Sequence, residues 1–381
     1  MLGGLAETMK AAFLYSDEFS RFNYGTSHPL KPIRLKLTYE LIKACGLLTP
    51  SDPRLIEPHP ALVEDLRTFH SPDYLDMLKA SNSGRSPAGA ALFGLGPGDN
   101  PVFAGVFDWS LLVAGASLKA ADLVDSGEAE VAFNISGGLH HAMADHASGF
   151  CYINDPVIAI KTLVKRGRRV AYVDIDAHHG DGVQEAFFGS DKVLTISLHE
   201  TGQALFPGSG FEYELGAGAG TGYSVNIPLP PETDDELFVH AFAEVVPPLL
   251  DVFRPDIVVS QLGVDTFRSD PLAHLNITTN GFCHIVTMLK AMAPKWVALG
   301  GGGYDIANVA RAWTLAWAIM NDTDAPAEIP DFFRQQHPHV GFAGTKLQDQ
   351  PYEMGGRRKE EMRKEVARLV DYSKRHGMRR L

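Results

Sequence analysis

The sequence predicts an α/β protein in which a parallel β-sheet is covered by helices on both faces. Apolar segments of strand length alternate with helical patterns over most of the 381 residues. These segments lack the polar and apolar alternation of a sheet with one face in water, which favours parallel strands buried on both sides. No internal repeat or linker divides the chain, so we expect one domain with a single core.

Seven segments are predicted strands, because each is short, apolar and bounded by glycine or polar residues. They are residues 11–15, 131–135, the run from 170, 193–198, 223–227, 257–262 and 296–299. Helices are predicted where apolar residues recur with the helical period. They cover residues 31–45, 60–70, a segment from 71, 103–126, 156–166, 234–253, 279–292 and 307–320. Residues 81–100 have no apolar period, and loops of this length are usually functional or disordered.

The overall composition excludes several classes of protein. A net charge of −12 argues against general affinity for nucleic acid or anionic membranes, and fits a cationic partner such as a lysine-rich peptide or an amine. No apolar run approaches membrane length. The three cysteines (Cys45, Cys151 and Cys283) are too few and too widely spaced for a disulfide framework or a cysteine metal site. Because no signal-like segment opens the chain, we expect a cytoplasmic protein.

One stretch of the chain carries metal-ligand residues at a regular spacing. Asp174, Asp176 and His178 follow one another at i, i+2 and i+4 in an apolar run. In an extended strand this spacing places all three side chains on one face. Two carboxylates and an imidazole on one face, at the point where a strand ends, suit a divalent metal.

Polar or glycine-rich residues follow three other predicted strands. His140 and His141 come after one strand, Asp265 after a second, and the segment 300–304 after a third. Ligands of open parallel sheets bind beyond the carboxyl ends of the strands, so we expect these residues to converge. Asp176, His178 and Asp265 would then form a ligand set of two carboxylates and one imidazole, leaving positions open for water and substrate.

The ligand set leaves two questions open. The carboxylates could instead cap helices or pair with an arginine, although the spacing favours a metal. Zinc, ferrous iron, manganese and cobalt all suit these donors.

The adjacent His140 and His141 are candidates for general acid/base catalysis. Each would need a carboxylate to fix its tautomer, and Asp174 and Asp181 are available. The alternative is that they are ordinary loop histidines or metal ligands. Tyr304 follows four glycines, which let the backbone approach a pocket closely, so its phenol could face developing oxyanion charge.

Two phenylalanines lie in glycine-flanked loops. Phe150 and Phe206 are either pocket walls or core residues, and the sequence alone favours the core. The glycines at 300–303 could suggest a phosphate cradle. No Gly-Lys-Ser/Thr follows them, so phosphate binding is disfavoured.

Taken together, these motifs resemble those of the histone deacetylase family, in the class I-like branch that includes the bacterial acetoin-utilisation deacetylases. The resemblance covers roughly residues 13–320. It rests on segments 28–32, 137–142, 148–155, 174–182, 206–208, 263–265 and 299–304.

The resemblance implies the arginase/deacetylase fold with an eight-stranded parallel sheet, and a role for each motif. Asp176, His178 and Asp265 would bind zinc. His141, backed by Asp181, would be the general base, His140 with Asp174 its electrostatic partner, and Tyr304 the oxyanion donor. The implied substrate-site residues are Asp99, Gly149, Phe150, Phe206, Leu272 and Gly302, with Arg34 in an inner channel. Potassium would bind at Asp174, Asp176, His178, Ser197 and Leu198, and at Phe187, Ser190, Val193 and Tyr223.

The expected function is therefore zinc-dependent removal of acetyl or similar acyl groups from lysine side chains of proteins or peptides. Leu272 lies where polyamine-specific relatives carry a glutamate, so acetylpolyamines are the less favoured alternative. A non-catalytic acyl-lysine binder is a third possibility. The metal loaded in the cell, the acyl-chain preference and the oligomeric state stay open.

We expect a catalytic domain over residues 1–325 and an extension over 326–381. Residues 357–380 hold ten Lys or Arg and four Asp or Glu. Met362, Val366, Leu369 and Val370 give this segment the apolar stripe of an amphipathic helix. Packing on the domain or on a partner subunit is favoured over binding to nucleic acid.

Overall fold

The computed structural model describes residues 9–342 and 344–377, which form one α/β domain around an eight-stranded sheet. All its strand pairs are parallel, and the strand order is β2-β1-β3-β8-β7-β4-β5-β6. The strands are β1 (Met9–Leu14), β2 (Leu55–Ile56), β3 (Ala129–Asn134), β4 (Val170–Asp174), β5 (Val193–Glu200), β6 (Ser224–Leu229), β7 (Ile257–Gln261) and β8 (Trp296–Leu299). This architecture confirms the predicted parallel sheet.

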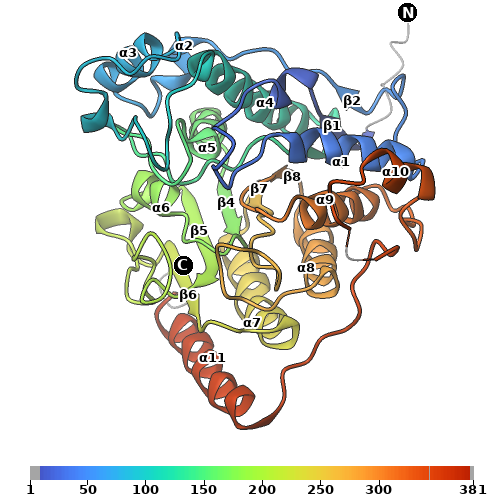
Figure 1. Cartoon of the computed structure of the whole chain (residues 1–381). Coiled ribbons are helices and arrows are strands. Elements are labelled where there is room, and N and C mark those ends of the chain that lie inside the picture. The colour runs from blue at the N-terminus through green and yellow to red at the C-terminus, as the bar shows by residue number, and fades with distance from the viewer. Residues whose placement is uncertain (1–8, 343, 378–381) are drawn as a thin grey trace, which may run out of the picture.

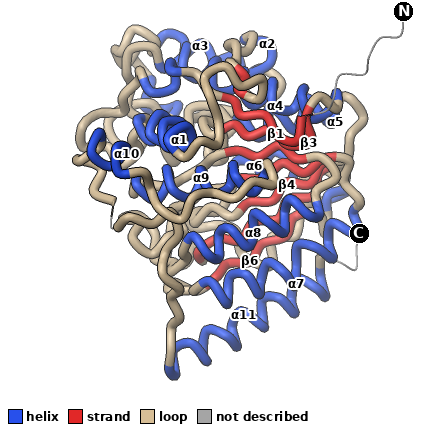
Figure 2. Tube along the Cα trace, turned by 90° about the vertical axis from the view of Figure 1, so that its right-hand side faces the viewer, coloured by secondary structure: helices blue, strands red, loops and turns tan. Residues whose placement is uncertain are grey.

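Helices cover both faces of the sheet (Figures 1 and 2). On one face α4 packs on β3 and α5, and α6 continues the layer; on the other, neighbouring contacts join α1, α9, α8 and α7. The α-helices are α1 (Ile33–Ala44), α2 (Val63–Leu66), α3 (Pro72–Ala80), α4 (Val106–Ser126), α5 (Asp155–Lys165), α6 (Asp181–Phe187), α7 (Asp235–Phe253), α8 (Thr279–Met292), α9 (Ile306–Met320), α10 (Asp331–Gln336) and α11 (Gly356–His376). None of the helices in the described ranges is both long and apolar enough to span a bilayer.

The structure corrects the local predictions at four places. The helix predicted over 60–70 is only the single turn α2, and the two-residue strand β2 was missed because it is too short to show a pattern. Residues 81–100 include a short 3-10 helix, Ala90–Phe93. The strand through the metal segment ends at Asp174, because side chains replace the ladder bonds beyond it. The N–H of Asp176 donates to Asp174 Oδ1 and that of His178 to Asp176 Oδ1, both at 3.0 Å.

The C-terminal helix α11 packs on its own domain, against α7 and the edge strand β6 (Figure 1). Its apolar stripe is buried, and Lys359 is buried between the carboxylates of Asp234 at 3.1 Å and Glu236 at 2.6 Å. A helix that covers an edge strand blocks pairing with another chain. In the described residues, the basic segment predicted from the sequence therefore covers the edge strand β6. Residues 378–380 of that segment lie outside the described residues.

Replacing the buried Leu369 of this helix by Ala should destabilise the domain by about 2–4 kcal/mol, because the truncation leaves a cavity between α11 and the sheet. Chemical denaturation monitored by circular dichroism measures this loss. The matched control is Lys364→Ala on the exposed face of the same helix, which should change stability by less than about 0.5 kcal/mol. Equal stability of both variants would show that α11 is not part of the cooperative unit.

Candidate active site

The candidate site lies beyond the carboxyl ends of β3, β8, β7 and β4, which are neighbours in the sheet. Their last residues are in register across the sheet: Asn134 pairs with Leu299, Leu299 with Gln261, and Gln261 with Asp174. The loops that follow these four residues carry the predicted histidines, Tyr304 and the three metal ligands. The insertion of β7 and β8 between β3 and β4 thus brings together segments that are far apart in the chain.

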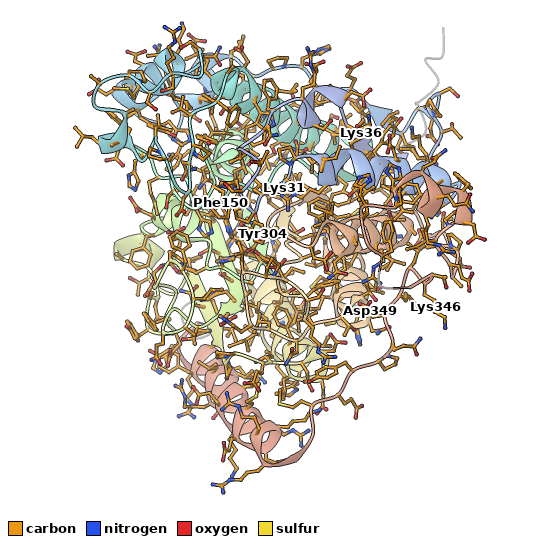
Figure 3. All side chains as sticks on the ribbon, viewed as in Figure 1. Lys31, Lys36, Phe150, Tyr304, Lys346 and Asp349 are labelled. Atoms are coloured by element: carbon orange, nitrogen blue, oxygen red, sulfur yellow. The ribbon has the colours of Figure 1, made fainter. Side chains whose placement is uncertain are left out.

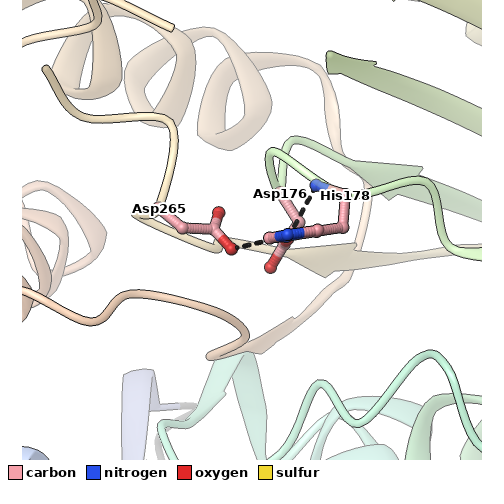
Figure 4. Close-up of side chains that lie close together, drawn as sticks. All are labelled: Asp176, His178 and Asp265. Carbon is pink, nitrogen blue, oxygen red and sulfur yellow. Dashed lines mark hydrogen bonds and ion pairs between the residues drawn. The ribbon is translucent and has the colours of Figure 1, made fainter. Parts of the chain in front are cut away.

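Asp176, His178 and Asp265 converge at this edge (Figure 4), and one donor atom from each lies within 4.8 Å of the others. His178 Nδ1 lies 2.9 Å from Asp265 Oδ2 and 3.3 Å from Asp176 Oδ1. All three side chains are buried. Two buried carboxylates facing one imidazole leave uncompensated negative charge, which a divalent cation at their meeting point would neutralise. The donor set therefore fits a metal.

Hydrogen bonds from the surrounding backbone and from the side chain of Gln261 orient these ligands. Asp176 Oδ2 accepts from the N–H of Gly302 at 2.7 Å and from Gln261 Nε2 at 3.2 Å, and Asp265 Oδ1 accepts from the N–H of Ala177 at 2.8 Å. A Cβ at Gly302 would lie only 2.0 Å from Asp265 Oδ2. Gly302 therefore lies behind the ligands and contacts them directly, whereas the resemblance placed it at the substrate.

The two histidines form an asymmetric pair. His140 Nδ1 lies 2.8 Å from Asp174 Oδ2 and His141 Nδ1 lies 2.7 Å from Asp181 Oδ1, while their Nε2 atoms are 2.9 Å apart. Burial lowers the pKa of His140, but the carboxylates of Asp174 and Asp176 outweigh it and raise that pKa to about 9. Burial and the charge of His140 lower the pKa of His141 to about 4. At neutral pH His140 holds the proton and His141 is free to accept one.

A cavity of about 240 Å³ opens above these groups. It is lined by Asp99, His141, Gly149, Phe150, His178, Leu205, Phe206, Leu272 and Tyr304. Phe206 is 43% exposed and its ring meets that of His141 edge-on, with centroids 5.0 Å apart. Phe150 and Phe206 thus line the cavity, where the family resemblance placed them, rather than lying wholly in the core as the local pattern favoured. Phe150 also packs against a core cluster.

Tyr304 also lines this cavity, and its ring meets that of Phe150 edge-on, with ring centroids 5.7 Å apart (Figure 3). Burial and the carboxylates of Asp265 and Asp176 raise the pKa of the phenol well above its usual value, so it remains a hydrogen-bond donor. Its backbone N–H donates to Asp270 Oδ2 at 2.8 Å. The guanidinium of Arg34 donates to the carbonyl groups of Gly301 at 2.6 Å and Gly303 at 2.8 Å. The glycine run before Tyr304 is thus held from two sides.

Sequence reasoning missed three residues that support the site. Tyr172 Oη donates to Asp174 Oδ2 at 2.7 Å, Gln261 bonds Asp176, and Asp270 accepts from the backbone at Tyr304. Tyr172 and Gln261 lie in apolar strands, where a single polar residue is the only available signal. The expected potassium ligands lie mainly around β5; Asp174 pairs in register with Ser197, and potassium binding stays a prediction.

Comparisons with known proteins agree with this geometry. The model of the histone deacetylase domain matches residues 28–320. Acetoin utilization protein AcuC of Bacillus subtilis (strain 168) is 42% identical over 328 residues, 84% of each chain. Histone deacetylase 1 of Homo sapiens is 38% identical over 334 residues, 86% of this chain and 68% of that protein.

Solved structures lead to the same conclusion. The crystal structure of an HDAC homolog from Aquifex aeolicus superposes with a TM-score of 0.88 at 33% identity, covering 96% of this chain and 99% of that chain. An HDAC homolog complexed with SAHA aligns with the same TM-score and identity, over 97% of this chain and 100% of that one. The family match spans all four strand ends that build the site. The chain therefore belongs to the histone deacetylase family.

Proposed function

We propose that this protein is a zinc-dependent deacylase that hydrolyses acetyl or similar acyl groups from lysine side chains of proteins or peptides. The observation that carries the proposal is one cavity lined by His178 of the metal-binding triad, by the carboxylate-backed His141 and by the phenol of Tyr304. An acyl-lysine fits such a cavity because its thin aliphatic stem can pass between Phe150 and Phe206. The family membership supports amide hydrolysis as the reaction class.

The residues of the chain divide the chemistry among them. A divalent metal, when bound, would polarise the amide carbonyl and acidify water. His141 accepts a proton from the attacking water, and Asp181 holds its imidazole in the required orientation. Tyr304 donates to the carbonyl oxygen as negative charge develops there. His141 then protonates the departing amine, so that the products are a carboxylate and a free lysine side chain.

Turnover of an acetyl-lysine peptide by the wild type and by Tyr304→Phe tests this assignment. We expect kcat to fall about 100- to 1000-fold in the variant with little change in KM, because the lost donor acts on charge that develops only in the transition state. Tyr39→Phe is a matched control, since Tyr39 lies on α1 outside the cavity. Equal rates for Tyr304→Phe and wild type would remove Tyr304 from the mechanism.

Asp174→Asn should separate catalysis from metal binding. Asp174 bonds His140, while the metal triad consists of other residues. We expect kcat to fall about 10- to 100-fold with the zinc content nearly unchanged, because the variant loses the charge that keeps His140 protonated. Metal analysis of the purified variant beside its kinetics decides this, and loss of zinc would contradict the separation.

Hydrolysis of acetylated polyamines or other small amides is the alternative function. Leu272 lines the cavity, and its apolar side chain cannot pair with a distal ammonium group. Parallel assays of acetyl-lysine peptides and acetylated diamines distinguish the two substrates, and metal-dependent turnover of either ends the non-catalytic alternative. The identity of the metal, binding of potassium and a cytoplasmic location are parts of the proposal that metal analysis and fractionation test.

A further inference from the structure

Glu200 is a buried carboxylate that the proposed chemistry does not use. It ends β5, is 1% exposed, and binds a single residue through both oxygens. Its Oε2 accepts from the backbone N–H of His274 at 2.7 Å, and its Oε1 lies 2.8 Å from His274 Nδ1. A buried charge costs free energy unless it is fully paired, so this bidentate contact holds His274 firmly.

His274 lies on the loop between β7 and α8, two residues after the cavity residue Leu272. Asp270 lies two residues before Leu272, and the backbone N–H of Leu272 donates a hydrogen bond to Asp270 Oδ1 at 2.9 Å. The carbonyl of His274 also accepts from the N–H of Glu232 at 2.7 Å. The Leu272 wall of the cavity is therefore held at two points, by Asp270 from within the loop and by Glu200 from the sheet.

Glu200 is also bonded to the metal segment and lies near the opposite wall in the sequence. Its backbone N–H donates at 2.9 Å to the carbonyl of Ala177, which lies between two of the metal ligands. Five residues further along the chain, Leu205 begins the wall that includes Phe206. Glu200 thus connects the Leu272 loop, through its carboxylate, to the metal segment, through its backbone N–H.

We propose that Glu200, acting through His274, sets the separation of the Leu272 and Phe206 walls and is therefore a positioning residue for binding of the lysine stem. This inference rests on the proposed deacylase function. Asp270 accepts hydrogen bonds from the backbone N–H groups of both Leu272 and Tyr304, so the loss of Asp270 would disturb catalysis and binding alike. Glu200 has no contact with Tyr304 in the hydrogen-bond network of the described residues, so its loss would change binding alone.

The test measures kcat and KM of His274→Ala and Glu200→Gln with acetyl-lysine and butyryl-lysine peptides. Because one charge-assisted hydrogen bond is lost, we expect KM for the acetyl peptide to rise about tenfold while kcat stays within about twofold of wild type. KM for the butyryl peptide should rise by a similar factor, because both peptides present the same lysine stem to the Leu272 wall. His274→Asn, whose amide can donate to Glu200 in place of Nδ1, should restore most of the lost affinity.

His274→Ala is the decisive variant, because this side chain is 63% exposed and its removal leaves the fold intact even where Glu200→Gln does not fold. The matched control is His284→Ala, an exposed histidine on α8. Unchanged KM in His274→Ala, with an active wild type, would overturn this inference alone. A metal-loaded wild type without turnover of either peptide would overturn the proposed function and the inference with it.

Discussion

Asp265→Asn is expected to abolish hydrolysis and to lower the affinity for zinc by at least about 100-fold, because one of the two carboxylates of the triad loses its charge. The substitution is nearly isosteric, and the new side chain can still accept the Ala177 N–H through Oδ1. The fold should therefore persist. Metal content of the dialysed protein, measured by plasma emission spectroscopy, and titration with a competing chelator report the loss directly.

The thermal stability of the same variant gives a second readout. Burial and the charge of Asp176 raise the pKa of Asp265 to about 6, so at pH 7 its ionised form costs stability in the metal-free protein. We expect metal-free Asp265→Asn to be at least as stable as metal-free wild type. Zinc at about 100 times its Kd should stabilise wild type by about 2.7 kcal/mol and the variant hardly at all.

The exposed Asp145→Asn is the control for both measurements. It makes the same chemical change outside the triad and should keep zinc content, activity and the zinc-induced rise in Tm. If Asp265→Asn retained zinc at the wild-type level, Asp265 would have to be removed from the ligand set.

His141→Ala is expected to lower kcat about 1000-fold, within the range typical of a lost general acid/base, and to leave zinc content unchanged. His141 lines the cavity, and its low pKa keeps it neutral and able to accept a proton at pH 7. Stopped assays over long incubation with an acetyl-lysine peptide measure the residual rate. Added imidazole should restore part of it, because the substitution leaves an imidazole-sized space beside Asp181.

The exposed His146→Ala, five residues further along, controls for loss of a histidine in the same loop. Its kcat should match wild type. A His141→Ala enzyme within about tenfold of the wild-type rate would mean that His140 or water serves as the base, and the roles of the two histidines would have to be exchanged.

Much of the site could be predicted from sequence because its residues follow strand ends. Each buried strand is marked by an apolar run, and polar residues directly after such a run must lie at the sheet edge. Asp176, His178 and Asp265 converge there. For Phe150 and Phe206 the local pattern favoured the core and the family resemblance the substrate site, because an aromatic residue in a loop has the same local pattern whether it faces the core or a cavity; both line the cavity.

The sequence by itself determined the fold class, the chemical nature of the ligands and the family, because these depend on apolar periodicity and on residue types at short spacing. The family resemblance implied how the carboxylates are shared, and the tertiary structure supplies the contacts that residue patterns alone had left open: Asp174 with His140, Asp181 with His141, and Asp176 with the metal triad. That division depends on the turn after β4. There the backbone N–H groups of Asp176 and His178 donate to side-chain oxygens instead of a neighbouring strand, and the regular alternation of the strand ends. It also depends on β7 and β8 lying between β3 and β4, a strand order that no local pattern encodes.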